Sequence, residues 1–281
     1  EEAIGVSKII EQKLKKKYSL NNVSILVRAI FQTREFEERF LKIGMGYRVI
    51  GGTKFYERAE IKDSVAFLRV VNQKNDDLAL ERIINTPKRS IGDTSVKQLY
   101  EWGRKNKKTL EDSAIELIQL NKIKPKTKLG LMQILNLLNK WRQDSKHKSH
   151  YELMEIILDE SGYSKMLKDK KDLENEGKLE NLKELIKGMH DFDNLQSFLE
   201  HVALATSLDN DWNGQKVNLM TIHAAKGLEF DAVFLPGWEE GLFPHQKALE
   251  EKGDAALEEE RRLAYVGITR AKKESFISFT M

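Results

Sequence analysis

Residues 217–244 read VNLMTIHAAKGLEFDAVFLPGWEEGLFP, and residues 258–273 read EEERRLAYVGITRAKK. The first segment contains two apolar runs, Val217–Ile222 and Asp231–Leu235, which predict two buried strands joined by a polar turn. The second segment predicts a helix that ends near Arg270. Such alternation of strands and helices is typical of a parallel α/β sheet, which binds ligands at the carboxyl ends of its strands.

The usual phosphate-binding loop, GxxxxGK[ST], occurs nowhere in the 281 residues. The chain therefore carries at most half of a nucleotide site of that kind. It opens with EEAIGVSKII, which is acidic and helical in pattern and does not resemble a signal peptide. We expect a piece of a longer protein.

Composition limits the classes of partner. The charged fraction is 32% but the net charge is only +3, so contacts with nucleic acid must come from local basic clusters. The absence of cysteine excludes disulfides and thiolate metal sites and fits a cytoplasmic protein. The apolar runs fall short of the ~20 residues that span a bilayer, so no membrane association is expected.

The first part of the chain also alternates between helical and strand patterns. Apolar spacing predicts helices over Glu1–Lys17 and Glu35–Ile43. The β-branched run Val23–Arg28 predicts a buried strand, and Tyr47–Ile50 predicts a second, short strand before a Gly-Gly turn. This part therefore belongs to the same sheet domain as the segment after Val217.

From Glu60 onward the pattern is helical only. Helical spacing is found in Glu60–Val71, Leu78–Asn85, Ser95–Asn106, Leu110–Leu120, Leu129–Arg142, Tyr151–Ser161, Lys178–Met189 and Leu195–Ala205. We place a border at the basic, aperiodic segment Asn121–Lys128 and the return at the polar segment Ser207–Gly214. The predicted organisation is an α/β domain (1–121 and 207–281) split by a helical insertion (122–206).

Polar residues follow the strand predicted at Val217–Ile222. Thr221, His223 and Lys226 lie at its exit, where ligands bind in parallel sheets. Gly227 permits close approach of a ligand to the backbone, and Glu229 can accept hydrogen bonds from a ribose hydroxyl. A plain strand-to-helix turn is the alternative interpretation of this segment.

Four segments together resemble the superfamily 1 DNA helicases of the UvrD, Rep and PcrA type. TIHAAKGLEFDAVFLPGWEEGLFPH is similar to their motif V and its extension, and EEERRLAYVGITRA to motif VI. SILVRAIFQTREFEERFLKIGMGYRVIGGTKFYERAEIKD is similar to the motif IV region, and INTPKRSIGDTS to the segment after it. The resemblance runs from end to end. It implies the second RecA-like domain of a P-loop NTPase, interrupted by an all-α insertion and lacking the P-loop half.

The resemblance implies roles in ATP hydrolysis for two arginines. Arg28 matches the motif IV arginine that reaches the γ-phosphate, and Arg270 matches the arginine finger of motif VI. A planar, always-charged donor fork suits a transferring phosphoryl group. The alternative is an ion pair with nearby glutamates, above all between Arg270 and Glu258–Glu260.

The resemblance also assigns the remaining nucleotide contacts. It implies that Glu229 accepts from the ribose and that Gly227 lies beside the phosphates. Val27 departs from the pattern, because several relatives place a tyrosine there against the adenine. ATP with Mg²⁺ would be held mainly by the missing N-terminal half.

The DNA contacts implied by the resemblance fall in two groups. Thr221, His223 and His245 match residues that contact single-stranded DNA, although His223 could chiefly couple the two sites.

Arg89, Thr94 and Lys97 surround a predicted helix N-terminus, where an anion such as a duplex phosphate is favoured; the alternative is a helix capped by Asp93 or Thr94. Gly162, in the turn Ser161–Tyr163 before Lys165, resembles the insertion's duplex-binding turn. We expect Lys146–His150 to be a solvated loop.

The predicted function is the C-terminal region of an ATP-dependent 3′-to-5′ DNA helicase in repair or replication. Its partners would be single-stranded and duplex DNA, the N-terminal RecA-like half and possible repair proteins. The chain alone should be inactive. Two alternatives stay open: a DNA-binding or partner-docking module without catalysis, and a helicase–nuclease subunit of the RecB/AddA type.

Overall fold

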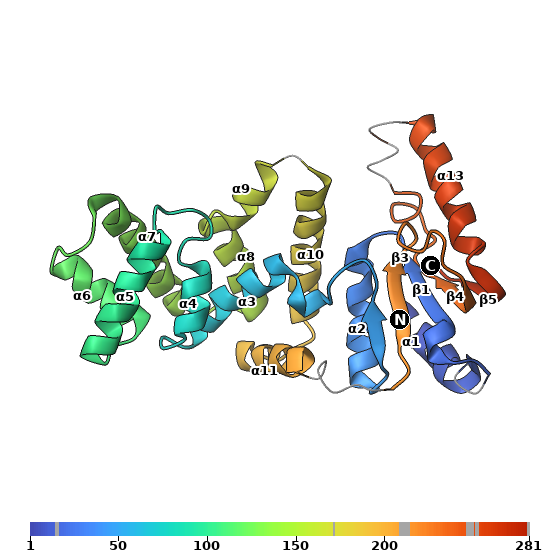
Figure 1. Cartoon of the computed structure of the whole chain (residues 1–281), viewed down its shortest axis with the longest axis horizontal. Coiled ribbons are helices and arrows are strands. Elements are labelled where there is room, and N and C mark those ends of the chain that lie inside the picture. Colours follow the sequence, from blue (N-terminus) through green and yellow to red (C-terminus); the bar gives the residue numbers. More distant parts are fainter. Residues whose placement is uncertain (15–16, 171, 208–213, 246–249, 251–252, 280–281) are drawn as a thin grey trace. The chain divides into compact units, whose positions relative to one another are not determined.

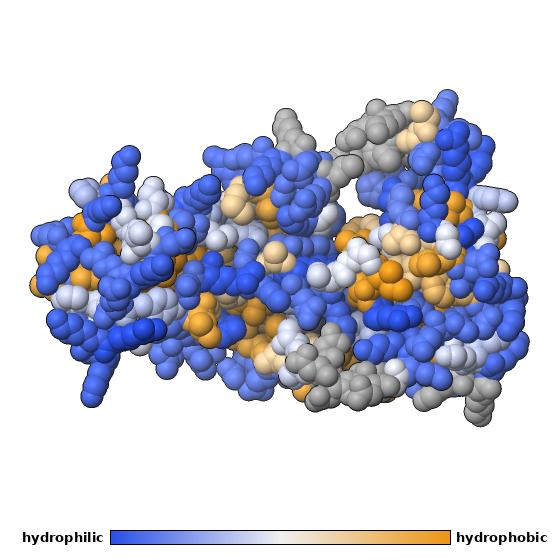
Figure 2. Space-filling view, viewed as in Figure 1, coloured by the Kyte–Doolittle hydropathy of each residue, from blue (hydrophilic) through white to orange (hydrophobic). Residues whose placement is uncertain are grey.

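The computed structural model describes residues 1–14, 17–170, 172–207, 214–245, 250 and 253–279. The chain forms two compact units, one of Glu1–Phe55 with Ser207–Met281 and one of Tyr56–Thr206. Within the described part of the chain, no helix has both the length and the apolar character needed to cross a membrane. The face visible in Figure 2 is mostly hydrophilic, in keeping with the charged fraction of 32%.

The first unit is built on a parallel sheet, which confirms the predicted α/β class (Figure 1). The strand order is β2-β3-β1-β4-β5. The strands are β1 (Val23–Val27), β2 (Tyr47–Val49), β3 (Val217–Thr221), β4 (Phe230–Leu235) and β5 (Ala271–Ile277). The two halves of the unit interleave, because β3 and β4 from the end of the sequence flank β1 from its beginning.

Both faces of the sheet are covered, so β1 is buried throughout, and β3 and β4 are buried except at Thr221 and Asp231. Ile25 and Val27 of β1 point into a core shared with α1 (Glu2–Ile9) and α2 (Thr33–Lys42). Leu26 points the other way, into a second core with Leu263. That residue belongs to α13 (Asp254–Ile268), which packs on β4 and β5. Short helical segments complete the unit at Ile10–Leu14, Leu20–Asn22 and Ile30–Gln32, and a further one, Phe55–Glu57, spans the border with the second unit.

The second unit is helical. Its helices are α3 (Ala59–Asn72), α4 (Asp77–Ile83), α5 (Asp93–Asn106), α6 (Leu110–Gln119), α7 (Pro125–Asp144), α8 (His150–Glu160), α9 (Tyr163–Lys168), α10 (Leu173–Met189) and α11 (Leu195–Ser207). Every helix expected from periodicity is present. The helix α9 was not predicted, because its 6 residues are too few to show a period. The polar segment Ser207–Gly214 was expected to lead back to the sheet domain, and residues 208–213 of it lie outside the described residues.

The expected border at Asn121–Lys128 lies inside the helical unit. α3 contacts α7, α8 and α10, so helices before and after this segment share one core. Within it, Phe67 packs edge-on against Trp141 and Tyr163, with ring centroids 5.8 and 6.3 Å apart. The compact units instead divide near Phe55 and Thr206. The basic composition of the segment reflects an exposed turn between α6 and α7.

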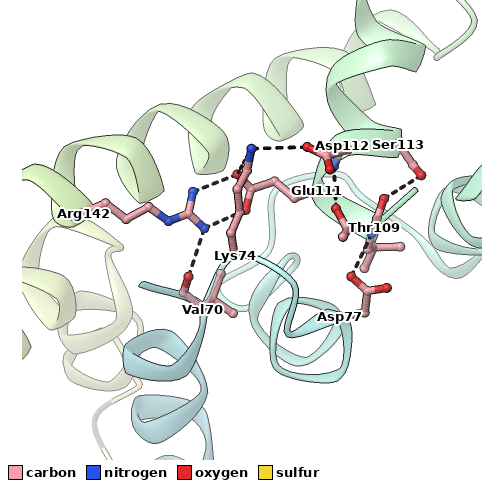
Figure 3. A network of polar contacts seen from close by, with 9 residues as sticks. Val70, Lys74, Asp77, Thr109, Glu111, Asp112, Ser113 and Arg142 are labelled. Carbon is pink, nitrogen blue, oxygen red and sulfur yellow. Dashed lines mark hydrogen bonds and ion pairs between the residues drawn. The ribbon is translucent and has the colours of Figure 1, made fainter. Parts of the chain in front are cut away.

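A buried ion pair ties the helical unit together (Figure 3). Arg142 of α7 donates from Nη1 and Nη2 to the two carboxylate oxygens of Glu111 on α6, at 2.8 and 2.7 Å. Nη2 also donates to the carbonyl of Val70 on α3 at 2.9 Å. The Lys74 ammonium lies 3.9 Å from Glu111 and 3.2 Å from Asp112. The bidentate pair of Arg142 and Glu111 therefore links the three helices α3, α6 and α7.

A close approach of α7 to the loop before α5 depends on Gly130. A Cβ added there would lie 2.0 Å from the carbonyl oxygen of Arg89.

Gly130→Ala is expected to lower the free energy of unfolding by about 1–3 kcal/mol through overpacking. Gly177 of α10 has no atom within 4 Å of an added Cβ, so Gly177→Ala is the matched control. It should stabilise by about 0.5–1 kcal/mol, since alanine favours helix interiors. Urea denaturation measures both, and equal effects would contradict the prediction.

Candidate functional site

Two neighbouring strands bring predicted site residues to the carboxyl edge of the sheet. Val27 and Thr221 are partners in the register of β1 and β3, and the backbone N–H of Ile222 donates to the carbonyl of Val27 at 2.9 Å. Arg28 therefore leaves the sheet beside the turn that follows β3. The Thr221 hydroxyl accepts from the backbone N–H of Ala224 at 3.2 Å and so holds the turn that carries His223.

Arg28 is paired with a glutamate from the helix of the second motif. Its Nε donates to both carboxylate oxygens of Glu260, at 3.0 and 2.9 Å, and its Nη2 donates to Oε1 at 2.6 Å. The side chains of Arg28 and Glu260 are 20% and 7% exposed. Burial alone would raise the pKa of the Glu260 carboxyl, but hydrogen bonding and charge from Arg28, with a contribution from His245, lower it. The carboxylate is therefore ionised at neutral pH.

Both predicted histidines lie close to this pair. The backbone N–H of His245 donates to Oε2 of Glu260 at 3.3 Å. His223 is an exposed residue, yet desolvation of its ring, followed by the positive charge of Arg28, lowers its pKa; Glu260 and Glu259 oppose this effect. The imidazole of His223 is accordingly neutral at pH 7. Arg28, Thr221, His223 and His245 thus gather at one edge of the sheet.

Arg270 lies at the other end of α13. Its Nε donates to the carbonyl of Val266 at 3.0 Å, its Nη1 to the carbonyl of Leu228 at 3.1 Å, and its Nη2 to the Thr269 hydroxyl at 3.0 Å. The alternative reading of Arg270, an ion pair with residues 258–260, is not what the structure shows among the described residues. Their partners are Arg261, Arg262 and Arg28.

The loop before β4 lies next to Arg270. The backbone N–H of Phe230 donates to the Arg270 carbonyl at 2.9 Å, where β4 and β5 begin. Gly227 has a φ of 85° and Glu229 is exposed, with its carboxylate 3.6 Å from the Lys272 ammonium. Gly227, Glu229 and Arg270 thus share the amino edge of the sheet, whereas Arg28 lies at the carboxyl edge. Helix α13 extends between the two groups.

In the helical unit, the structure corrects the role expected for Arg89. Its guanidinium donates at 3.1–3.4 Å to the carbonyl oxygens of Ile83, Ile84, Thr86, Pro87 and Ser161. Burial lowers the pKa of Arg89 to about 10. A guanidinium enclosed by carbonyl oxygens in this way is not available as a phosphate ligand. Arg89 instead holds the loop before α5.

The turns expected to bind duplex DNA are joined through Arg89, because its bond to Ser161 connects the loop before α5 to the turn of Gly162. Gly162 has a φ of 78° and is the N-cap of α9. Thr94 and Lys97 are exposed in the first turns of α5.

Two further expectations about this unit meet different outcomes. The N-cap of α5 is Gly92, which has no side chain to cap with, rather than Asp93 or Thr94. The segment expected to be a solvated loop is an exposed turn at residues 146–148, but its last residue, His150, is buried at the start of α8. Its Nε2 lies 2.7 Å from the Met189 carbonyl.

Comparisons with known proteins agree with this arrangement. The sequence pattern of the UvrD-like helicase C-terminal domain matches residues 1–281. The chain belongs to this family.

The sequence is also similar to those of several DNA helicases. A probable DNA helicase II homolog of Rickettsia felis is 44% identical over 265 residues, which cover 93% of this chain and 40% of that protein. The ATP-dependent DNA helicase PcrA of Bacillus subtilis is 40% identical over 275 residues, or 93% of this chain and 37% of PcrA. DNA helicase II of Haemophilus influenzae is 38% identical over 289 residues, or 99% and 40%. The chain thus spans about two fifths of the length of these relatives.

The residues of this UvrD-like domain for which nucleotide contacts are expected differ in their surroundings. Arg28 keeps Nη1 clear of Glu260, and Gly227 has open space around it. Val27 is fully buried in the α1 and α2 core, so its side chain cannot take the place of a stacking tyrosine. Among the described residues, no group of three or more His, Cys, Asp or Glu could hold a metal ion.

Sequence reasoning missed Glu260 as a site residue. It lies 232 positions from Arg28, and only the fold brings the two together. One weak indication was available. A helix that packs across the ends of the strands can place a glutamate from its first half beside a cation at those ends.

Proposed function

We propose that this chain is the C-terminal region of an ATP-dependent 3′-to-5′ DNA helicase or translocase acting in DNA repair or replication. The family match over the whole chain supports this proposal, as do the relatives named DNA helicase II and ATP-dependent DNA helicase PcrA. The structural observation that carries it is the gathering of Arg28, His223 and His245 around Glu260. Since the substrate would be chromosomal DNA, we propose the cytoplasm as its compartment.

In the proposed reaction the chain supplies cations to a nucleotide held mainly by an N-terminal RecA-like half. ATP with Mg²⁺, when bound, supplies the phosphoryl group whose transfer to water drives movement. Arg270 would donate to the γ-phosphate and neutralise the charge that develops on it. The resemblance implies the same role for Arg28, but Arg28 lies at the other edge of the sheet beside the residues proposed to contact DNA, so we do not assign it to the same phosphate. Glu229 would orient the ribose, and the backbone at Gly227 would approach the phosphates.

The DNA contacts would lie on both units. Thr221, His223 and His245 would contact single-stranded DNA at the carboxyl edge of the sheet. Thr94 and Lys97, exposed in the first turns of α5, and the half-buried Gly162 would contact duplex phosphates, with Arg89 joining the loop before α5 to the turn of Gly162. Since these contacts address the DNA backbone, binding would be weakly sequence-specific and sensitive to salt. Closure on ATP and opening after hydrolysis would move the DNA.

The decisive experiment measures ATPase activity with and without an N-terminal half. Because the lysine loop is missing from the sequence, the chain alone should show no DNA-stimulated ATPase. Adding the N-terminal half of a relative such as Bacillus subtilis PcrA, in trans or as a fusion, should restore it. ATP hydrolysis by the chain alone would contradict the proposal that the N-terminal half holds the nucleotide. DNA binding without restored ATPase would favour a docking module instead.

A further inference from the structure

The positive charge of this chain is concentrated in one part of the helical unit. Residues 85–130 include α5, α6 and the start of α7, and the structure describes all of them (Figure 1). They contain eleven Lys and Arg against five Asp and Glu, which gives a formal net charge of +6. The whole chain carries only +3, so the remainder is net acidic. A polyanion is therefore attracted to this part of the molecule rather than to the rest.

The turn between α6 and α7 lies against the loop before α5. The Thr127 hydroxyl donates to the carbonyl of Ser90 at 3.1 Å, and the side-chain amide of Gln98 donates to the carbonyl of Lys122 at 2.9 Å. These bonds hold exposed lysines from two segments close together. We call them the turn lysines: Lys88, Lys122, Lys124 and Lys126.

The charges of the turn lysines are not neutralised by neighbouring acids. The acidic residues of α6 take other partners: Glu111 pairs with Arg142, Asp112 with Lys74 and Glu116 with Lys108. Among the described residues, no ion pair includes Lys88, Lys124 or Lys126. The ammonium of Lys122 lies 4.6 Å from the centre of the Trp102 ring. An external anion can therefore meet these lysines without breaking an ion pair.

Local stability does not explain the lysines at the start of α7. Lys124 is the N-cap and makes no capping bond with its side chain, and the first turn of the helix contains no acidic residue. Lys126 adds another cation to this turn, where the positive end of the helix dipole disfavours it. Residues that break a local rule in this way are typical of functional surfaces.

We propose that the turn lysines bind the phosphate backbone of double-helical DNA. A duplex presents about one phosphate charge for every 1.7 Å of its axis, so several lysines can each meet a phosphate. Single-stranded DNA fits less well, because its binding uses exposed aromatic rings, whereas Trp102 is half-buried beneath Lys122. The inference rests on the proposed function, since it extends the duplex contacts of Thr94 and Lys97 to a turn outside them.

The test compares two double variants of the chain by fluorescence anisotropy with a labelled duplex of about 20 base pairs. Lys124→Gln with Lys126→Gln removes two turn lysines. Lys183→Gln with Lys187→Gln is the matched control, because it removes the same charge from α10, where Glu180 and Glu184 already pair with it.

The two double variants should differ clearly. For the turn lysines we expect about tenfold weaker binding at about 50 mM salt, and a dependence of log Kd on log salt whose slope is smaller by about 2. The control should change Kd by less than about twofold. The melting temperature should not fall for Lys124→Gln with Lys126→Gln, because the change removes cations from the first turn of a helix.

Three results would overturn the proposal. Equal losses in both double variants would show an effect of net charge alone. An equal loss of affinity for oligothymidylate would show that the turn lysines do not prefer a duplex. Displacement of the duplex by polyglutamate at the same concentration of charge would assign the surface to acidic proteins instead.

This measurement needs no ATP, so it is separate from the test of the proposed function. If the fusion with an N-terminal half shows no DNA-stimulated ATPase, the proposed function fails, while duplex binding by the chain still decides the role of the turn lysines. An active fusion in which Lys124→Gln with Lys126→Gln leaves duplex binding unchanged refutes this inference alone.

Discussion

Replacing Arg270 by alanine is expected to lower the kcat of the DNA-stimulated ATPase by about 10³–10⁵-fold, the effect typical of an arginine finger. The measurement uses the fusion with an N-terminal half, at saturating ATP and DNA. The reason is electrostatic: the guanidinium would neutralise charge that develops on the γ-phosphoryl oxygens in the transition state. The KM for ATP should change far less than kcat, because this interaction strengthens only during the reaction.

A structural role for Arg270 predicts a different result. In the structure its guanidinium donates to the carbonyls of Val266 and Leu228 and so satisfies the end of α13. Loss of such a contact at a helix C-terminus costs about 0.3–1 kcal/mol, which lowers the melting temperature slightly and leaves kcat almost unchanged. A kcat within tenfold of the unsubstituted protein would therefore contradict catalysis by Arg270.

Two variants serve as controls for that measurement. Arg262→Ala removes an arginine of the same helix that is 77% exposed and should leave kcat unchanged. Arg270→Lys keeps the positive charge but loses the planar fork, so it should restore only a small part of the activity. Recovery of full activity by lysine would show that charge alone suffices.

Replacing Arg142 by alanine is expected to lower the free energy of unfolding of the helical unit by about 3–5 kcal/mol. The Glu111 and Arg142 side chains are 2% and 17% exposed. Removal of the guanidinium leaves an ionised carboxylate in the interior, and Lys74, at 3.9 Å, is too distant to replace a bidentate partner. Equilibrium urea denaturation of the chain, followed by circular dichroism, gives the change.

An exposed ion pair in the same unit provides the control. Lys183 and Glu180 lie 2.7 Å apart on α10 with side chains 72% and 43% exposed, and Lys183→Ala should cost less than about 1 kcal/mol. Replacing both members of the buried pair, as in Arg142→Met with Glu111→Leu, should be less harmful than Arg142→Ala, because no charge is left buried. Equal losses for Arg142→Ala and Lys183→Ala would refute the argument from burial.

The sequence by itself determined the local elements and the edge of the sheet at which several site residues lie. The apolar run of β1 is buried at every position, and the helical periods from Glu60 onward all correspond to helices. Arg28 and Thr221 could be assigned to one edge, because parallel strands end on the same side of a sheet. These properties follow from residues a few positions apart, where side-chain period and backbone propensity act directly.

Only the tertiary structure decided which partner each charged group takes and where the compact units divide. Arg28 rather than Arg270 pairs with Glu260, Arg89 is enclosed by carbonyl oxygens, and the helices α3 to α6 belong to the helical unit. The order β2-β3-β1-β4-β5 brings together segments that are more than two hundred positions apart. A charge that folding removes from water takes whichever partner the fold places beside it, and no local pattern encodes that choice.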